Sequence, residues 1–308
     1  MPRERQHLLS PCSCLARCGI WVGDGRSTTW LEEATAIHEE THRQFFHVFI
    51  QFGSTFLYET HVQMPVTAAE ARTHMSEMEI AGLHGCVASV DATHVAMERC
   101  PFRLSNQHIG PKLALPSRTY NIAVNHRRQI LHSTTGHPAR WNDKTIQLFD
   151  EFMTQIHHNG DILSDVRFHL LERKNNGDIT TVCYEGVWIM VDNGYLHWSM
   201  AVPPYKHPIH HDELRFSKWL ESMRKDVECT FGIMKGRFRI LKCGIRLHGV
   251  EATDKVWRTC CALHNMLLEA DGLSAEWNTG VQSDWQGVLG QHESDDVNKH
   301  MPELIRRS

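Results

Sequence analysis

The sequence predicts a mixed α/β fold in which one sheet is covered by helices. Four apolar, β-rich runs indicate strands, the second and third being joined as a hairpin: residues 85–97, 119–125, 128–136 and 186–195. Apolar residues at helical spacing indicate helices at three places: 141–160, 217–238 and 252–269. The order is therefore strand, hairpin, helix, strand and then helices.

Further helices are expected before the first strand. Residues 30–52 carry acids early and aromatics late, and Thr67 is suited to cap a helix that begins at residue 68. The predicted organisation has four parts: an irregular segment (1–28), a helical region (29–83), an α/β domain (84–271) and a polar tail (272–308).

Two of the predicted helices have a clear buried face. Asn142 or Asp143 can cap the helix over 141–160, and Gly160 can end it. Its expected buried stripe is Ile146, Phe149, Met153 and Ile156. In the helix over 217–238, the expected inward residues are Val227, Phe231, Met234 and Phe238.

Composition excludes several classes of protein. No apolar run reaches the ~18 residues of a membrane helix, and the N-terminus lacks the apolar core of a signal peptide. The ten cysteines are therefore expected to be reduced thiols. Cys12, Cys14 and Cys18 have a loose metal-like spacing, but no fourth ligand lies nearby, so a zinc site is disfavoured. The stretch with His207, His210 and His211 predicts a loop.

Charge is unevenly distributed around a net value of −4. Residues 101–142 contain six Lys or Arg and no acid, and residues 215–246 contain nine Lys or Arg against three acids. Two such segments could hold a phosphate backbone, or they could be ordinary solvated surfaces.

Three acids stand out by their position. Asp91 is expected to end the first strand, Asp192 ends the later buried strand, and Glu228 lies on the following helix. If the two strands are parallel neighbours, their ends meet at one crevice, where open α/β sheets bind ligands. Clustered carboxylates repel each other unless cations join them, and Mg²⁺ and Mn²⁺ prefer such oxygen ligands. Two ions of this kind can cleave a phosphodiester bond.

Each acid also has a simpler interpretation. Asp192 is suited to an Asx turn, and Asp91 could bond the amides that follow it. Glu228 lies four residues after Arg224, the spacing of an ordinary helix ion pair. Asp226 is a competing candidate on another side of the same helix. The order of strands and helices nevertheless favours a ribonuclease H-like sheet.

Five motifs at these residues resemble those of the PIF/Harbinger transposase family. In chain order they are SVDATH, GHPARWNDKTI, VDNGY, DVECTFGIMKGRFRIL and CCALHNML. The resemblance runs from about Gly85 to Glu269. It implies a ribonuclease H-like nuclease domain whose catalytic, metal-binding triad is Asp91, Asp192 and Glu228. Asp143 also matches an acid of the family pattern; we interpret it first as a helix N-cap and second as an accessory metal-site group.

The sequence therefore predicts a transposase or transposase-derived endonuclease that uses a two-metal site of Mg²⁺ or Mn²⁺. DNA contacts are expected from seven basic residues: Lys225, Lys235, Arg237, Arg239, Arg127, Arg128 and Arg140. The alternatives are a domesticated DNA-binding or chromatin-associated protein that no longer cuts, and a phosphohydrolase acting on small phosphoesters. The resemblance further implies a nuclear location and a separate Myb-like partner, and a homo-oligomer is left open.

Overall fold

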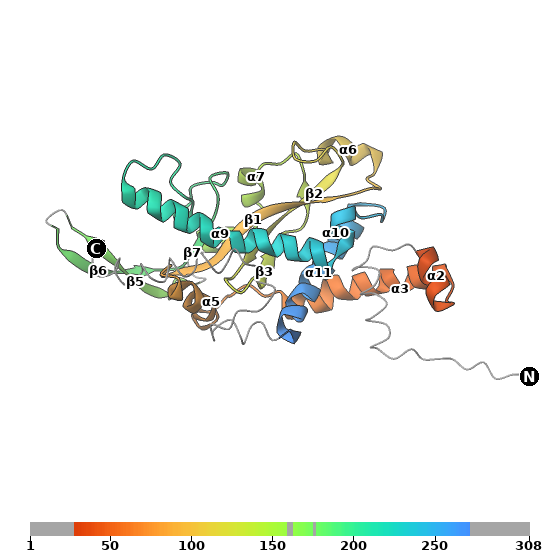
Figure 1. Ribbon diagram of the computed structural model, residues 1–308, viewed down its shortest axis with the longest axis horizontal. Helices are drawn as coiled ribbons and strands as arrows, with labels where there is room; N and C mark the ends of the chain where they lie inside the picture. Colours follow the sequence, from red (N-terminus) through yellow and green to blue (C-terminus); the bar gives the residue numbers. More distant parts are fainter. Residues whose placement is uncertain (1–27, 159–162, 175–176, 272–308) are drawn as a thin grey trace, which may run out of the picture.

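The computed structural model describes residues 28–158, 163–174 and 177–271 (Figure 1). Almost all of the predicted irregular N-terminal segment, with its three cysteines, lies outside the described residues, as do Gly160 and the predicted tail over 272–308. No helix in the described part of the chain is long and apolar enough to cross a membrane.

The N-terminal region is helical, as predicted. It contains α2 (Thr28–Thr35), α3 (Glu39–Phe52), a π-helical turn η1 (Gly53–Leu57), α4 (Tyr58–His61) and α5 (Ala68–Ile80). The pattern over 30–52 suits one amphipathic helix or a pair, and the structure has the pair α2 and α3, which is divided where Ala36 takes a positive φ of 55°. Thr67 caps α5 in a capping box with Glu70, which confirms the predicted cap.

The central sheet is mixed, and its strand order is β3-β2-β1-β7-β8, with β4 also paired to β2. Its strands are β1 (Cys86–Ala96), β2 (Ser117–Val124), β3 (Ile130–Ser133), β4 (His137–Pro138), β7 (Trp188–Met190) and β8 (Ala201–Val202). The strand β2 is antiparallel to β1 and β3, whereas β1, β7 and β8 are parallel. This mixed sheet with flanking helices confirms the predicted ribonuclease H-like fold class.

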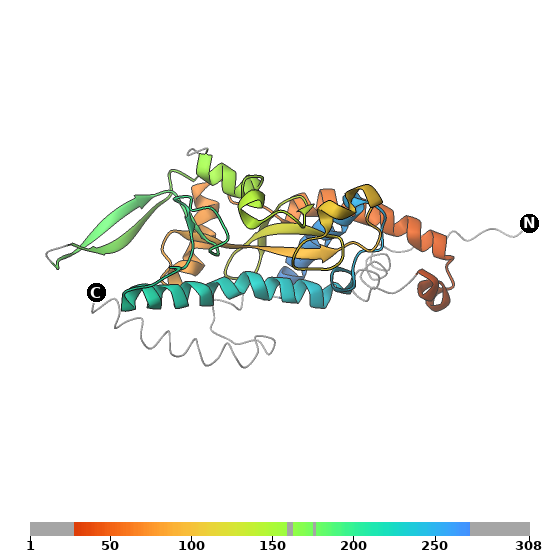
Figure 2. The same cartoon turned by 90° about the horizontal axis from the view of Figure 1, so that it is seen from above.

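The long helix α9 (His211–Arg237) runs along one side of the sheet (Figure 2). Together with α10 (Arg239–Cys243) and α11 (Val250–Ala270), it packs with α3, η1 and α4 on the apolar side chains of β2. Val227, Met234 and Phe238 are buried there, as predicted, and Phe231 is partly buried against them. A second core joins β1, β7 and β8 to α5 and α8 (Glu151–His158).

The expected single helix over 141–160 is instead two helices, α7 (Asp143–Gln147) and α8. Asn142 caps α7 by accepting the Thr145 N–H, so Asp143 is not the cap. The Asp150 carboxylate accepts the Met153 N–H and starts α8 afresh. This break turns Phe149 outward, so the prediction that it is buried was wrong.

Three further elements differ from the predictions. The helix α6 (Phe102–His108) and the separate hairpin of β5 (Arg167–Arg173) with β6 (Ile179–Glu185) were not predicted. The hairpin extends away from the sheet at one end of the molecule (Figure 1). The helix α9 begins earlier than expected, because His210 and Glu213 form a capping box. The loop expected there therefore ends at His210.

Candidate active site

Asp91, on β1, and Asp192, two residues past the end of β7, lie at equivalent positions relative to two neighbouring parallel strands. The last paired residues of β1 and β7 are Ser89 and Met190, and each acid follows its strand's pair by two residues. The predicted parallel arrangement is therefore present. Asp91 does not end its strand, however, because β1 continues to Ala96 along the antiparallel strand β2. The site therefore lies where β7 ends beside β1, which continues.

The turn after β7 brings a further acid close to Asp192. The Asp192 Oδ1 atom accepts the Gly194 N–H at 2.7 Å, so the Asx turn considered from the sequence is formed. A Cβ atom on Gly194 would lie 2.8 Å from Asp143 Oδ2 and 2.9 Å from Asp192 Oδ1. The absence of a side chain at Gly194 therefore allows the two carboxylates to stand on either side of one small space.

The electrostatics show that the three aspartates affect one another. Burial raises the pKa of Asp91 to about 6; the Arg224 guanidinium and the Ala92 N–H oppose this, and the charges of Asp192 and Asp143 add to it. Burial also raises the pKa of Asp143, against the charge of Lys112 and together with that of Asp192. Such a group of carboxylates is stabilised by a cation.

Glu228 reaches this group through Arg224 on the same helix. The Arg224 Nη2 atom lies 3.5 Å from Glu228 Oε1, and its Nη1 atom lies 3.6 Å from Asp91 Oδ2. The Arg224 side chain is 12% exposed, whereas that of Glu228 is 57% exposed. The face of α9 that bears Glu228 is therefore turned towards Asp91.

Asp226, the competing acid of α9, points elsewhere. Its Oδ2 atom lies 2.6 Å from His126 Nδ1, and its Oδ1 atom lies 3.7 Å from Arg128 Nε. Both partners belong to the turn between β2 and β3. Asp226 therefore joins α9 to the turn between β2 and β3, where it has partners of its own.

The residues present match the chemistry of a hard divalent cation. Asp91, Asp143 and Asp192 offer carboxylate oxygens, the donors that Mg²⁺ and Mn²⁺ prefer. No three His, Cys, Asp or Glu side chains within the described residues are already close enough together to hold a metal ion. These carboxylate oxygens fit such an ion, but the carboxylates must move closer together to bind it.

Comparison with known proteins identifies the family. Residues 90–265, more than half of the chain, match the family described as DDE superfamily endonuclease. The chain belongs to this family. The matched range contains Asp91, Asp192 and Glu228, and the resemblance that the five motifs indicated is confirmed.

One curated relative is "Protein ALP1-like" of Arabidopsis thaliana. It is 21% identical over 251 residues, which cover 81% of this chain and 59% of the relative. The chain therefore spans little more than half the length of this relative. No solved structure matches the chain.

Two cations near the acids were not among the predicted site residues. The sequence indicates Arg224 only as an ion-pair partner of Glu228, and it places Lys112 only in the acid-free basic segment 101–142. The i,i+4 spacing was the signal for Arg224, whereas nothing local relates Lys112 to Asp143. Lys235, which was predicted, donates to Thr93 Oγ1 at 3.0 Å, two residues after Asp91 on β1.

The other predicted DNA-contacting residues fall into two groups. Three are in ion pairs within the protein: Arg127 with Glu77 at 2.6 Å, Arg128 with Asp226 at 3.7 Å and Arg237 with Asp271 at 2.9 Å. Three are exposed: Lys225, Arg140 and Arg239. The role of all six residues in DNA contact stays a prediction.

The CCALHNML motif has a structural explanation. Asn265 accepts the Ile130 N–H at 2.9 Å and donates to the Ile130 and His61 carbonyl oxygens at 2.8 and 2.7 Å. His264 Nε2 lies 2.9 Å from the Arg128 carbonyl oxygen. These bonds fix α11 to β3, to the turn before it and to α4.

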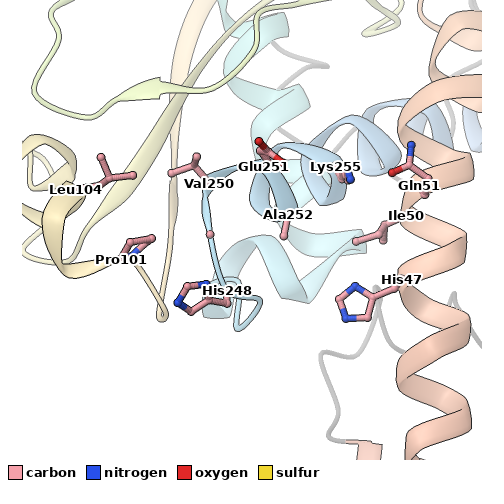
Figure 3. Close-up of a pocket in the computed structure, with 11 residues that line it drawn as sticks. His47, Ile50, Gln51, Pro101, Leu104, His248, Val250, Glu251, Ala252 and Lys255 are labelled. Carbon is pink, nitrogen blue, oxygen red and sulfur yellow. The ribbon is translucent and has the colours of Figure 1, made fainter.

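A hollow of about 510 Å³ lies away from the acids, between α3, the start of α6 and the start of α11 (Figure 3). Its lining combines polar and apolar residues from these three elements: His47, Ile50, Gln51, Pro101, Leu104, His248, Gly249, Val250, Glu251, Ala252 and Lys255. The predicted acids do not contribute to it. It therefore adds no residue to the candidate active site.

Proposed function

We propose that the chain is a DNA endonuclease of transposase type that depends on Mg²⁺ or Mn²⁺. The observation that supports this most is the equivalent placement of Asp91 and Asp192 relative to two parallel strands, with Asp143 beside them and Glu228 on the covering helix. Membership of the DDE superfamily endonuclease family gives the same chemistry an independent basis.

In this proposal Asp91 and Asp192 hold the metal ions and Glu228 completes the set, with Asp143 as an accessory group. Bound ions would activate the attacking oxygen and stabilise the leaving oxygen of a phosphodiester. Lys235 lies on the same side of β1 and would orient the DNA backbone. In a transposition reaction, the freed 3′ hydroxyl would then attack a target strand.

A plasmid-nicking assay tests the proposal. Purified protein is incubated with supercoiled DNA and Mg²⁺ or Mn²⁺, beside the variant Asp91→Asn. The matched control is Asp212→Asn, an aspartate on α9 whose side chain is 94% exposed. We expect metal-dependent nicking by the wild type and by the control, and none by Asp91→Asn. Equal nicking by all three proteins would disprove the assignment.

A second candidate is a DNA-binding protein of the same fold that does not cut. The observation in its favour is that Arg224, a cation of the protein itself, lies between Asp91 and Glu228. Fluorescence anisotropy with a labelled duplex separates the two. Salt-sensitive binding with no nicking at any metal concentration would favour this candidate.

Location and partners follow from a DNA substrate in either case. We propose a nuclear location and leave assembly, either with itself or with a Myb-like DNA-binding protein, to sedimentation and pull-down experiments.

A further inference from the structure

Arg224 occupies an unusual position for a helix arginine. It is 12% exposed, and it stands within 3.6 Å of a carboxylate oxygen of Asp91 and within 3.5 Å of one of Glu228. Its Nη1 atom is buried and makes no hydrogen bond. The guanidinium is therefore close to both carboxylates without forming the short, paired bonds of a settled Arg–carboxylate contact.

We propose that Arg224 is the built-in competitor of the metal: it neutralises Asp91 and Glu228 in the metal-free protein, and a divalent ion must displace it to bind them. This inference rests on the proposed function, because it takes the two acids to be metal ligands. It assigns to Arg224 the regulation of metal entry.

The charges around the site support the exchange. Asp91, Asp143 and Asp192 repel one another, so the metal-free site needs a cation, and Arg224 is the cation that pairs with Asp91. A divalent ion brings twice the charge of Arg224 to the same carboxylate oxygens. The ion and the guanidinium therefore compete for these oxygens. The long contacts of Arg224 make its release inexpensive compared with that of a bidentate pair.

Arg224 is also placed where its release is mechanically simple. It lies on the same helix as Glu228, one turn earlier, so freeing Glu228 requires only a change in side-chain rotamers. The backbone of α9 can stay in place. The carboxylates can then move together around the ion at the same time as the Arg224 side chain leaves them.

Isothermal titration with Mn²⁺ alone, without DNA, tests the proposal on the full chain. In Arg224→Gln we expect Mn²⁺ to bind roughly two- to fivefold more tightly than in the wild type, the factor that corresponds to losing long, weak ion pairs. Arg224→Lys keeps the charge but presents one ammonium in place of a two-armed group, so its affinity should lie between the two. The matched control is Lys218→Gln, which removes an exposed cation from the same helix; it should change the affinity less.

The outcomes separate this inference from the proposed function. If Asp91→Asn binds Mn²⁺ as well as the wild type does, the metal site itself is wrong. If Asp91→Asn abolishes binding while Arg224→Gln and Arg224→Lys bind no more tightly than the wild type, the displacement is refuted and the site stands. Should Arg224→Gln fail to fold, Arg224→Lys and the Mn²⁺-induced shift in unfolding temperature decide the question.

Discussion

Adding one methyl group at Gly194 should disable the acidic site and leave the fold intact. In Gly194→Ala, the new Cβ atom would lie 2.8 and 2.9 Å from oxygens of Asp143 and Asp192, whereas ordinary contacts begin at 3.4 Å. Rotating Asp192 away costs about 1 kcal/mol for a strained rotamer. Losing its bond to the Gly194 N–H costs about 1 kcal/mol more. The expected loss of stability is therefore about 2 kcal/mol.

The effect on metal binding should be larger than this loss suggests. A displaced carboxylate no longer meets its neighbours at one ion, and misplacement by about 1 Å can cost a hundredfold at a catalytic site. The assays are urea unfolding and Mn²⁺ titration. The control Gly236→Ala adds a Cβ atom with nothing within 4 Å. A Gly194→Ala protein that binds Mn²⁺ as tightly as this control would refute the placement of Asp143 and Asp192 around one space.

Three further predictions concern the helices around the sheet. Asn265→Leu leaves the buried backbone groups of Ile130 without partners and should cost roughly 3 kcal/mol in urea unfolding, whereas a loss below 1 kcal/mol would contradict the role given to the motif. Burial lowers the pKa of His264 to about 4, so stability should fall as pH drops from 6.5 to 4, by roughly 3 kcal/mol from this group. His264→Gln keeps a donor for the Arg128 carbonyl and should flatten that part of the pH profile; an unchanged profile would exclude His264 as its source. Gly232→Ala, with open space around the new Cβ atom, should raise the stability of α9 by about 1 kcal/mol, and weaker DNA binding would show that a phosphate approaches there.

The sign of the His264 effect follows from proton binding. The folded protein keeps this imidazole neutral down to about pH 4, whereas the unfolded chain protonates it near pH 6.5. Between these values the unfolded state binds more protons, so acid favours unfolding. Above pH 6.5 neither state is protonated, and the full stabilisation is present.

The sequence predicted those elements whose apolar residues form a continuous pattern. The inward face of α9 follows from helical apolar spacing, and the strand that carries Asp91 follows from its β-rich apolar run, because these side chains enter the core. The β5–β6 hairpin was not predicted, because no side chain of β6 is buried and its alternation is only between exposed and half-buried positions, which gives a weak apolar signal. The break between α7 and α8 also escaped, since apolar spacing continues across it. It depends on Asp150, which is held by Asn121 from a distant strand.

The candidate site also has features that the sequence could predict and features that it could not. The choice of Glu228 over Asp226 was within reach of the sequence, because a helix places residues two apart on different sides. The sequence could not show what each side of the helix faces, since His126, the partner of Asp226, lies a hundred residues earlier in the chain. Asp143 shows the limit most clearly. Next to Asn142, it has the sequence of a helix cap, and only the fold shows that Asn142 takes that role while Asp143 turns to Asp192.

The position of Arg224 has a consequence for interpreting intact acidic triads. A sequence that retains Asp91, Asp192 and Glu228 satisfies the pattern of an active nuclease, but the pattern does not include the cation that the metal must replace. The strength of the Arg224 contacts sets how much divalent ion is needed before the acids can close. A protein with every ligand in place could therefore be silent at low metal concentration and active at a higher one. Metal titration of nicking by the wild type, rather than a single metal concentration, is the measurement that separates a slow nuclease from a DNA-binding protein that has lost the reaction.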